Sequence, residues 1–201
     1  RDYLRACADL REYRHLGRFL IAFLLYNDGI QTIIAVSAIF AREELGLTTG
    51  TILGCFLMIQ FVAMPGALLF SRLAGRFNTK LAILASLLLF TAITVYASIM
   101  LSAVEFWVLG FAVAIVLGGS QALSRSLFSS MLPKNRSAEF FGFYAISSKF
   151  ASIFGPLAFA LLIDMTGSNR LAILALALFF VVGIVLLLGV DVEKGRQQAA
   201  S

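Results

Sequence analysis

The chain alternates between long apolar runs and short polar connections. Six runs cover about residues 19–41, 50–71, 81–104, 106–129, 140–163 and 171–190. Each run is long enough to cross about 30 Å of hydrocarbon as a helix that rises about 1.5 Å per residue. Only helices and closed barrels satisfy their backbone in lipid, and uninterrupted apolar runs of this length favour helices. The pattern therefore predicts an all-α integral membrane protein: a linker or amphipathic surface segment at 1–18, a six-helix transmembrane bundle at 19–190 and a tail at 191–201.

Composition supports a membrane protein and argues against other classes. Hydrophobic residues make up 60% of the 201 residues and charged residues only 13%, about half the charged share of a soluble domain. The net charge of +5 does not indicate nucleic-acid binding, because the charges lie in short loops rather than on one basic face. Metal clusters, nucleophile constellations and phosphate-binding loops are absent from the sequence, so we expect no catalytic residue, no cofactor and no metal, and not an enzyme.

The distribution of basic residues predicts the orientation. Thirteen of the sixteen Lys and Arg residues lie in the segments 1–18, 72–80, 125–136 and 194–196, which all fall on one side of the predicted membrane. The other side holds only Arg42 and Arg170, and Lys149 lies within a run. By the positive-inside rule, both termini are predicted to be cytoplasmic.

Polar residues inside the runs gather at one depth. Asp28 is the only charge in run 19–41, and Lys149 lies at a similar depth in run 140–163. Gln121 and Gln60 reach comparable depths in their own runs, all about 15 Å from the end that carries the termini. A polar layer near the bilayer midplane is where secondary transporters place their binding sites.

The runs also differ in how their polar residues are arranged. Runs 19–41, 106–129 and 140–163 each carry a polar stripe at helical spacing, and runs 81–104 and 171–190 are apolar on all sides. We therefore expect three helices to line a cavity or an interface and two to act as scaffold. Glycines inside the runs predict close contacts between helices: Gly110, Gly118, Gly119, Gly142 and Gly155.

The loop after the second run resembles a known motif. Residues 71–80 read Ser-Arg-Leu-Ala-Gly-Arg-Phe-Asn-Thr-Lys, similar to the Gly-x-Leu-Ala-Asp-Arg-x-Gly-x-Lys loop of the major facilitator superfamily. Arg76 and Lys80 match, Arg72 occupies the variable second position, and Gly75 stands where the family has its acid. The resemblance implies that Arg72, Arg76 and Lys80 form a conformational loop motif.

Two further stretches resemble one branch of that superfamily. Residues 23–32 (Phe-Leu-Leu-Tyr-Asn-Asp-Gly-Ile-Gln-Thr) and 118–126 (Gly-Gly-Ser-Gln-Ala-Leu-Ser-Arg-Ser), continuing to 139–142, are similar to the second half of vacuole-effluxer-like proteins. The resemblance implies the C-terminal six helices of a twelve-helix transporter, built as two inverted three-helix repeats. It also implies a missing N-terminal half as partner, amino acid export in fungal members, and the inner membrane of a bacterium as location. The chain begins with Arg1 and shows no signal-peptide pattern, so we expect it to be part of a longer protein.

Candidate site residues follow from the polar layer. Asp28 and Lys149 are predicted either to form a coupling pair that protonation of Asp28 breaks, or to form a static ion pair. Arg125 is predicted either to bind a substrate carboxylate or to anchor at the interface. Asn27, Gln31, Gln121 and Ser148 are candidate substrate or coupling-ion contacts. The rival hypothesis is a non-transporting bundle, an assembly or sensory subunit, in which the same layer only fixes helix packing.

Overall fold

The computed structural model describes residues 13–133 and 137–200, and this part of the chain is built from seven helices. Six are long and apolar enough to cross a membrane: α2 (Arg14–Glu43), α3 (Thr49–Arg76), α4 (Thr79–Ala97), α5 (Ala103–Ser130), α6 (Ser137–Thr166) and α7 (Asn169–Leu188). A short seventh helix, α8 (Val192–Ala200), follows them. The prediction of an all-α membrane bundle is confirmed.

Two predicted boundaries were wrong. The first span begins at Arg14, so the residues just before position 19 belong to α2 and not to a separate segment, and residues 1–12 lie outside the described part. The third run was drawn too long, because α4 ends at Ala97 and α5 begins at Ala103. The turn between them is closed by a capping box, in which Ser102 accepts from the backbone N–H of Glu105 and the Glu105 carboxylate accepts from that of Ser102. Apart from its two serines this turn is apolar, so hydrophobicity alone does not separate it from the helices on either side.

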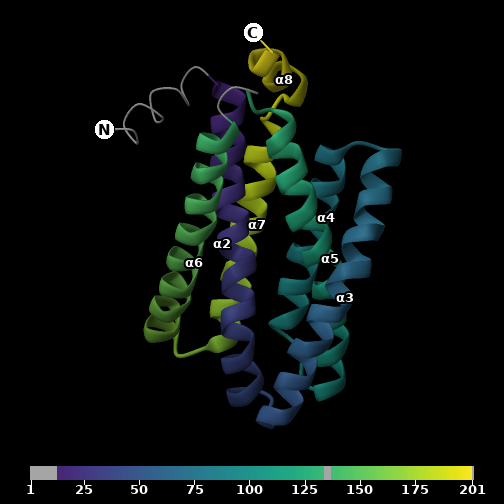
Figure 1. Cartoon of the computed structure of the whole chain (residues 1–201). Coiled ribbons are helices and arrows are strands. Elements are labelled where there is room, and N and C mark those ends of the chain that lie inside the picture. The colour runs from purple at the N-terminus through teal and green to yellow at the C-terminus, as the bar shows by residue number, and fades with distance from the viewer. Residues whose placement is uncertain (1–12, 134–136, 201) are drawn as a thin grey trace.

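The six long helices form two interleaved repeats of three. In Figure 1, α6, α2, α5 and α3 lie across the front, and α7 passes behind α2 while α4 passes behind α5. The first helix of each repeat packs on the second and third helices of the other repeat: α2 contacts α6 and α7, and α5 contacts α3 and α4. The two third helices, α4 and α7, pack on each other at the back. This is the arrangement of half a major-facilitator fold made of two inverted three-helix repeats.

An internal sequence repeat with an offset of ninety residues accompanies this symmetry. Residues 81–85 and 171–175 are both Leu-Ala-Ile-Leu-Ala, and α4 begins at Thr79 while α7 begins at Asn169. Phe90 and Phe180, which the same offset relates, stack with ring centroids 5.3 Å apart. The pseudo-two-fold axis of the half therefore passes between these two rings. The runs and charges alone do not reveal this repeat, although residue identity at an offset of ninety does.

Glycines bring the helix backbones together, as four of the five predicted positions confirm. A methyl group on Gly118 would strike the backbone of Ala63 in α3, and one on Gly155 would strike the Thr32 side chain in α2. Gly110 and Gly119 likewise face side chains of α3. Gly142 is the exception, because no described residue beyond its own neighbours lies within 4 Å of its added Cβ. Close backbone approach thus joins α3 to α5 and α2 to α6.

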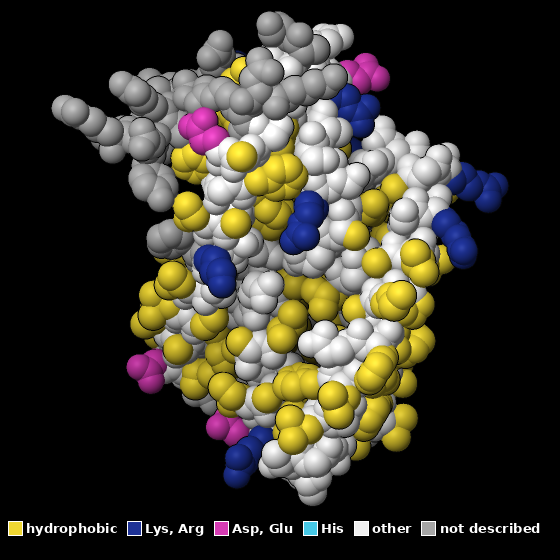
Figure 2. Space-filling model, viewed as in Figure 1, with side chains coloured by type: hydrophobic (Ala, Val, Ile, Leu, Met, Phe, Trp, Pro, Cys, Tyr) yellow, Lys and Arg dark blue, Asp and Glu magenta, His cyan; other side chains and the backbone are white. Residues whose placement is uncertain are grey.

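The bundle has two distinct ends. The terminal end carries the start of α2, the α3–α4 turn and α8, and the far end carries the α2–α3, α4–α5 and α6–α7 turns. Figure 2 shows Lys and Arg side chains concentrated toward the terminal end and apolar side chains over the opposite half of this face. The assignment of the terminal end to the cytoplasm stays a prediction from charge.

Candidate functional site

Asp28 is the least compensated charged group in the described bundle. Its side chain is 0% exposed, and neither carboxylate oxygen has a hydrogen-bond partner among the described residues. It lies halfway along α2. The backbone amide of Gly155 is close enough to act on the carboxylate electrostatically without forming a hydrogen bond. An uncompensated carboxylate at this depth costs several kcal/mol, in the order of 3 or more.

Helix packing on two sides explains why Asp28 is sealed. On one side, α2 meets α6 at the close contact between Thr32 and Gly155, and on the other Gly29 lies against Phe180 of α7. The Thr32 hydroxyl donates to the backbone carbonyl of Asp28 at 2.6 Å, so it does not serve the carboxylate. The residues that bury Asp28 therefore leave its oxygens unpaired.

The structure does not contain the predicted ion pair between Asp28 and Lys149. The Lys149 side chain is exposed and forms no ion pair with any described residue. Gly155 is the residue of α6 that faces α2 here, and six positions of an α-helix correspond to a rotation of about 600°, or 240° after full turns. Lys149 therefore projects from a different side of α6 than the one packed on Asp28.

Two hydrogen bonds connect α2 to α5 in the polar layer. The Gln121 side-chain amide donates to the Asn27 carbonyl oxygen at 2.8 Å. The hydroxyls of Tyr26 and Ser124 lie 2.6 Å apart, and Ser124 also donates to the carbonyl of Ser120. Asn27 Nδ2 is buried without a partner among the described residues. The structure therefore joins Asn27 to Gln121, two of the candidate contacts, and leaves the Asn27 amide donor and the Asp28 carboxylate unused beside them.

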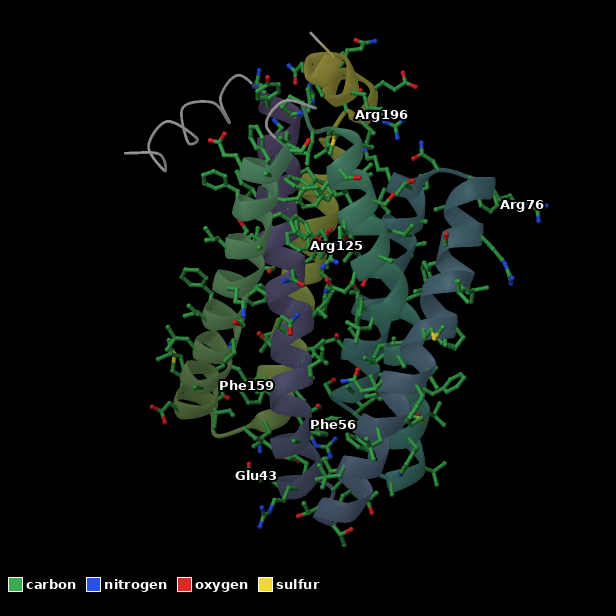
Figure 3. All side chains as sticks on the ribbon, in the orientation of Figure 1. Glu43, Phe56, Arg76, Arg125, Phe159 and Arg196 are labelled. Atoms are coloured by element: carbon green, nitrogen blue, oxygen red, sulfur yellow. The ribbon has the colours of Figure 1, made fainter. Side chains whose placement is uncertain are left out.

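The remaining candidates, Arg125, Gln31 and Ser148, are at least partly exposed. Arg125 is exposed near the middle of the bundle (Figure 3), and its guanidinium is within hydrogen-bonding reach of the Tyr144 hydroxyl. Gln31 is half-buried. Ser148 is half-buried and donates to the carbonyl of Ala145 in its own helix at 2.8 Å. These three side chains are at least partly exposed, whereas the Asp28 side chain is fully buried.

An aromatic cluster closes the bundle between the polar layer and the terminal end. Phe23 stacks on Tyr144 with centroids 4.3 Å apart, and Phe128 packs on Tyr144 at 4.9 Å and on Phe19 at 6.2 Å. The cluster joins α2, α5 and α6. Spacing along single helices does not show that these rings meet, because they come from three different helices.

An apolar pocket opens on the other side of the polar layer, toward the far end. Its volume is about 200 Å³, and α2, α3, α4 and α5 all contribute to its wall. Among the described residues that line it, only Ser37 and Gln60 have polar side chains. Phe56, also in the wall, lies on the front near the far end in Figure 3. Gln60 was predicted at the depth of the polar layer, but the structure places it in this apolar wall.

The three loop-motif residues have different environments. Arg72 and Arg76 are exposed, and Arg76 points away from the bundle in Figure 3. The Lys80 ammonium instead donates to the backbone carbonyls of Leu188 and Val190 at 3.0 and 2.7 Å. Lys80 is therefore tied to the end of α7.

The terminal end is covered by α8. Asp191 caps this helix by accepting from the backbone N–H of Lys194 at 3.1 Å, and this hydrogen bond lowers the pKa of the Asp191 carboxyl. The Asp191 backbone N–H donates to His15 Nδ1 at 3.2 Å. His15 therefore links α2 to the residue that caps α8.

No group of metal-ligating side chains occurs among the residues that the structure describes. The fold consists of six apolar helices in two inverted repeats, with an orphaned acid and bridging amides at mid-depth. These features define the class of protein as a six-helix membrane bundle of the major-facilitator type, with a polar layer at mid-depth.

Comparison with known proteins identifies the family. The profile of the family described as "Vacuole effluxer Atg22 like" matches residues 1–200, and the chain belongs to this family. It is 40% identical over 184 residues to the MFS-type transporter YxiO of Bacillus subtilis, covering 92% of this chain and 43% of that protein. It is 31% identical to Autophagy-related protein 22-1 of Aspergillus niger and 33% identical to Autophagy-related protein 22 of Kluyveromyces lactis, covering 95% and 90% of this chain. The chain spans only 34% and 39% of those two fungal proteins. The predicted superfamily and branch are confirmed, and the family consists of transporters rather than enzymes.

Proposed function

We propose that this chain is the C-terminal half of a secondary active transporter that moves a small polar solute, with amino acids as the first solutes to test. In this proposal an N-terminal six-helix half faces the front of the bundle, and the two halves rock to expose a shared cavity to either side of the membrane in turn. The family membership and the short coverage of full-length relatives support the proposal. The bacterial relative favours the inner membrane of a bacterium as the location.

The observation that carries the proposal is the orphaned carboxylate of Asp28. Its burial without a partner makes the charged form costly, so a structural role alone does not account for an acid at this position. Binding a proton, or a cationic group of the solute, would remove the cost. The charged form of Asp28 is destabilised only in the conformation that seals this residue between α6 and α7. Binding of a proton or a cation would therefore shift the equilibrium between that conformation and others. Asp28 would thereby couple the ion or solute to alternating access.

In this proposal Arg125, Gln31 and Asn27 bind the solute. Arg125 can hold a carboxylate through two parallel hydrogen bonds, and its exposure leaves its donors available. Gln31 and the unused amide donor of Asn27 lie beside the Gln121 bridge. Lys149 would add a second positive charge on the same half of the molecule rather than neutralise Asp28.

Transport by the full-length protein in proteoliposomes tests the role of Asp28. We expect Asp28→Asn to reduce amino acid flux at least tenfold and to abolish its dependence on pH. Asp164→Asn is the matched control, because Asp164 lies exposed near the far end of α6 and should transport normally. Unchanged rate and pH profile in Asp28→Asn would remove Asp28 from the mechanism.

Arg125→Lys tests solute recognition separately. The ammonium keeps the charge and loses the planar fork, so we expect the half-saturating solute concentration to rise about tenfold with the maximal rate less affected. Unaltered affinity would favour an interfacial anchor that reaches lipid phosphate or Tyr144.

The rival function is a non-transporting bundle that serves as an assembly or sensory subunit. The direct hydrogen bonds between α2 and α5 favour it, since they hold helices together without a solute. Single cysteines at Gln121 and Ser148, in a background without Cys7 and Cys55, distinguish the two. A water-filled cavity should let water-soluble thiol reagents reach both positions, and a dry bundle should protect them.

The size of the native product tests the missing half. An antibody against residues 1–18 should detect a membrane protein of about twice the 21.8 kDa of this chain. A band at 21.8 kDa would leave a homodimeric transporter or the rival bundle, which the cysteine probes separate.

A further inference from the structure

Two basic residues at equivalent places in the internal repeat bind the end of each other's helix. Lys80 is the second residue of α4, and its ammonium donates to the carbonyls of Leu188 and Val190, at the end of α7 and just beyond it. This contact joins α4 to α7 at the terminal end of the bundle.

Arg170 makes the counterpart contact at the far end. It is the second residue of α7, and its Nη1 donates to the carbonyls of Ser98 and Met100, just beyond α4, at 3.0 Å each. The offset of ninety residues relates Arg170 to Lys80, and it also relates these two carbonyls to those of Leu188 and Val190. The inverted repeat therefore accounts for both contacts. We call each contact a clasp: the basic second residue of one helix, α4 or α7, binds the carbonyls at the end of the other helix.

The physical basis is the unsatisfied C-terminus of a helix. The last carbonyls of a helix have no intrahelical partner and carry a partial negative charge, which a cation with hydrogen-bond donors neutralises. Lys80 is half-buried and Arg170 is half-buried, so water screens both contacts only in part. Charge-assisted hydrogen bonds of this type are stronger than neutral ones.

The two clasps differ in one respect. At the far end, Arg170 Nε also pairs with Glu44 at 3.1 Å, its guanidinium lies 5.7 Å from the Phe40 ring centroid, and Asn169 donates to Glu43 and Glu44. These contacts add the end of α2 to the far-end clasp. At the terminal end, the hydrogen bonds of the Lys80 ammonium with described residues go to α7 and the α7–α8 connection, and the start of α2 contacts α8 instead.

We propose that Lys80 and Arg170 are reciprocal clasps that make α4 and α7 one rigid spine, and that Glu44 hinges α2 to this spine at the far end. The terminal end of α2 is then the end that moves relative to the spine. Lys80 acts as a static positioning residue, in place of the conformational role that the loop motif implies.

Hydrogen–deuterium exchange of the full-length protein in lipid nanodiscs tests the clasps without any transport assay. Lys80→Met should speed hydrogen exchange at residues 184–190, the end of α7 and the residues just beyond it, about tenfold. This factor corresponds to about 1.4 kcal/mol. Exchange at residues 94–100 should be unchanged. Arg170→Met should give the opposite pattern. Faster exchange confined to the start of the substituted helix, or equal loosening of both helix ends, would overturn the proposal.

Conservative variants keep the test decisive if a methionine variant fails to fold. Lys80→Arg retains the cation and should leave residues 184–190 within about twofold of the wild type, whereas equal loosening in Lys80→Arg and Lys80→Gln would contradict a clasp made by charge.

Glu44→Gln tests the hinge: exchange at residues 38–44 should rise about tenfold, while residues 94–100 stay protected because the Arg170 Nη1 contacts remain. Protection at 38–44 equal to wild type would refute the hinge. Because exchange does not depend on a solute, a failure here is distinct from a failure of the proposed transport.

Discussion

Replacing Gly66 with alanine should force α3 and α5 apart. A Cβ built on Gly66 would lie 2.5 Å from the carbonyl oxygen of Ile115, 2.6 Å from its Cα and 2.9 Å from its carbonyl carbon. All three atoms are backbone, so no side-chain rotation relieves the overlap. Ordinary contact between carbon atoms begins at about 3.5 Å, so the two helices must separate by roughly 1 Å.

The cost follows from this displacement. Overpacking of a well-packed contact costs about 1–3 kcal/mol, and alanine returns at most about 1 kcal/mol of helix propensity relative to glycine. We therefore expect the free energy of unfolding of Gly66→Ala to fall by about 1–2 kcal/mol. Unfolding of the full-length protein by SDS in mixed micelles, followed by circular dichroism, measures this change.

Gly75→Ala is the matched control because it makes the same substitution in the same helix. Nothing lies within 4 Å of the Cβ that would be added at Gly75, so its stability should be unchanged or rise by up to about 1 kcal/mol. The packing argument would be refuted if Gly66→Ala were as stable as the wild type, or if both variants lost the same stability.

Three further predictions use single contacts. Tyr26→Phe removes the 2.6 Å hydroxyl contact with Ser124 and should cost about 1 kcal/mol in the same unfolding assay, and no loss would show that the contact is weak. Ser102→Ala removes the cap of α5 and should cost about 1 kcal/mol, whereas Ser102→Thr should lose much less; equal losses would exclude the cap. Because the folded-state pKa of Asp191 is lowered, its contribution is present above its unfolded pKa and is lost as pH falls below about 4. Proteolysis at α8 should therefore increase in acid but not between pH 5 and 9, and Asp191→Ala should be cut faster at neutral pH than Asp191→Asn.

The spans could be predicted because they depend on composition alone. A run of about 20 apolar residues must be helical in lipid whatever its neighbours are. The predicted end of the third run was wrong because the turn at 98–102 is largely apolar. The Ser102 cap, rather than hydrophobicity, sets where this turn ends. The ninety-residue repeat was available in the sequence and would have predicted that α4 and α7 begin at equivalent positions.

For the candidate site, the sequence predicted the depth and spacing of residues within each helix but not which helix faces meet. Asp28 and Gln121 were predicted to lie at one depth and Asn27 was predicted to be a candidate contact, and the structure joins Asn27 to Gln121 by a hydrogen bond that was not predicted. The same reasoning paired Asp28 with Lys149 and was wrong for this structure, because depth does not fix the rotation of α6 about its axis. Gly155 fixes that rotation, since it is the residue that lets α6 approach α2.

The sequence by itself determined the class of protein, the number of spans, the polar layer and, through its loop and helix motifs, the family. These follow from local quantities: hydrophobicity over a helix length, charge in the loops, and residue identity at short spacing. Only the tertiary structure decided that Asp28 is sealed without a partner, that Lys149 is exposed, and that Lys80 and Arg170 clasp opposite ends of α4 and α7. Such contacts join residues up to about a hundred positions apart, and they depend on which helix faces meet, which is set by packing across the whole bundle rather than by any one segment.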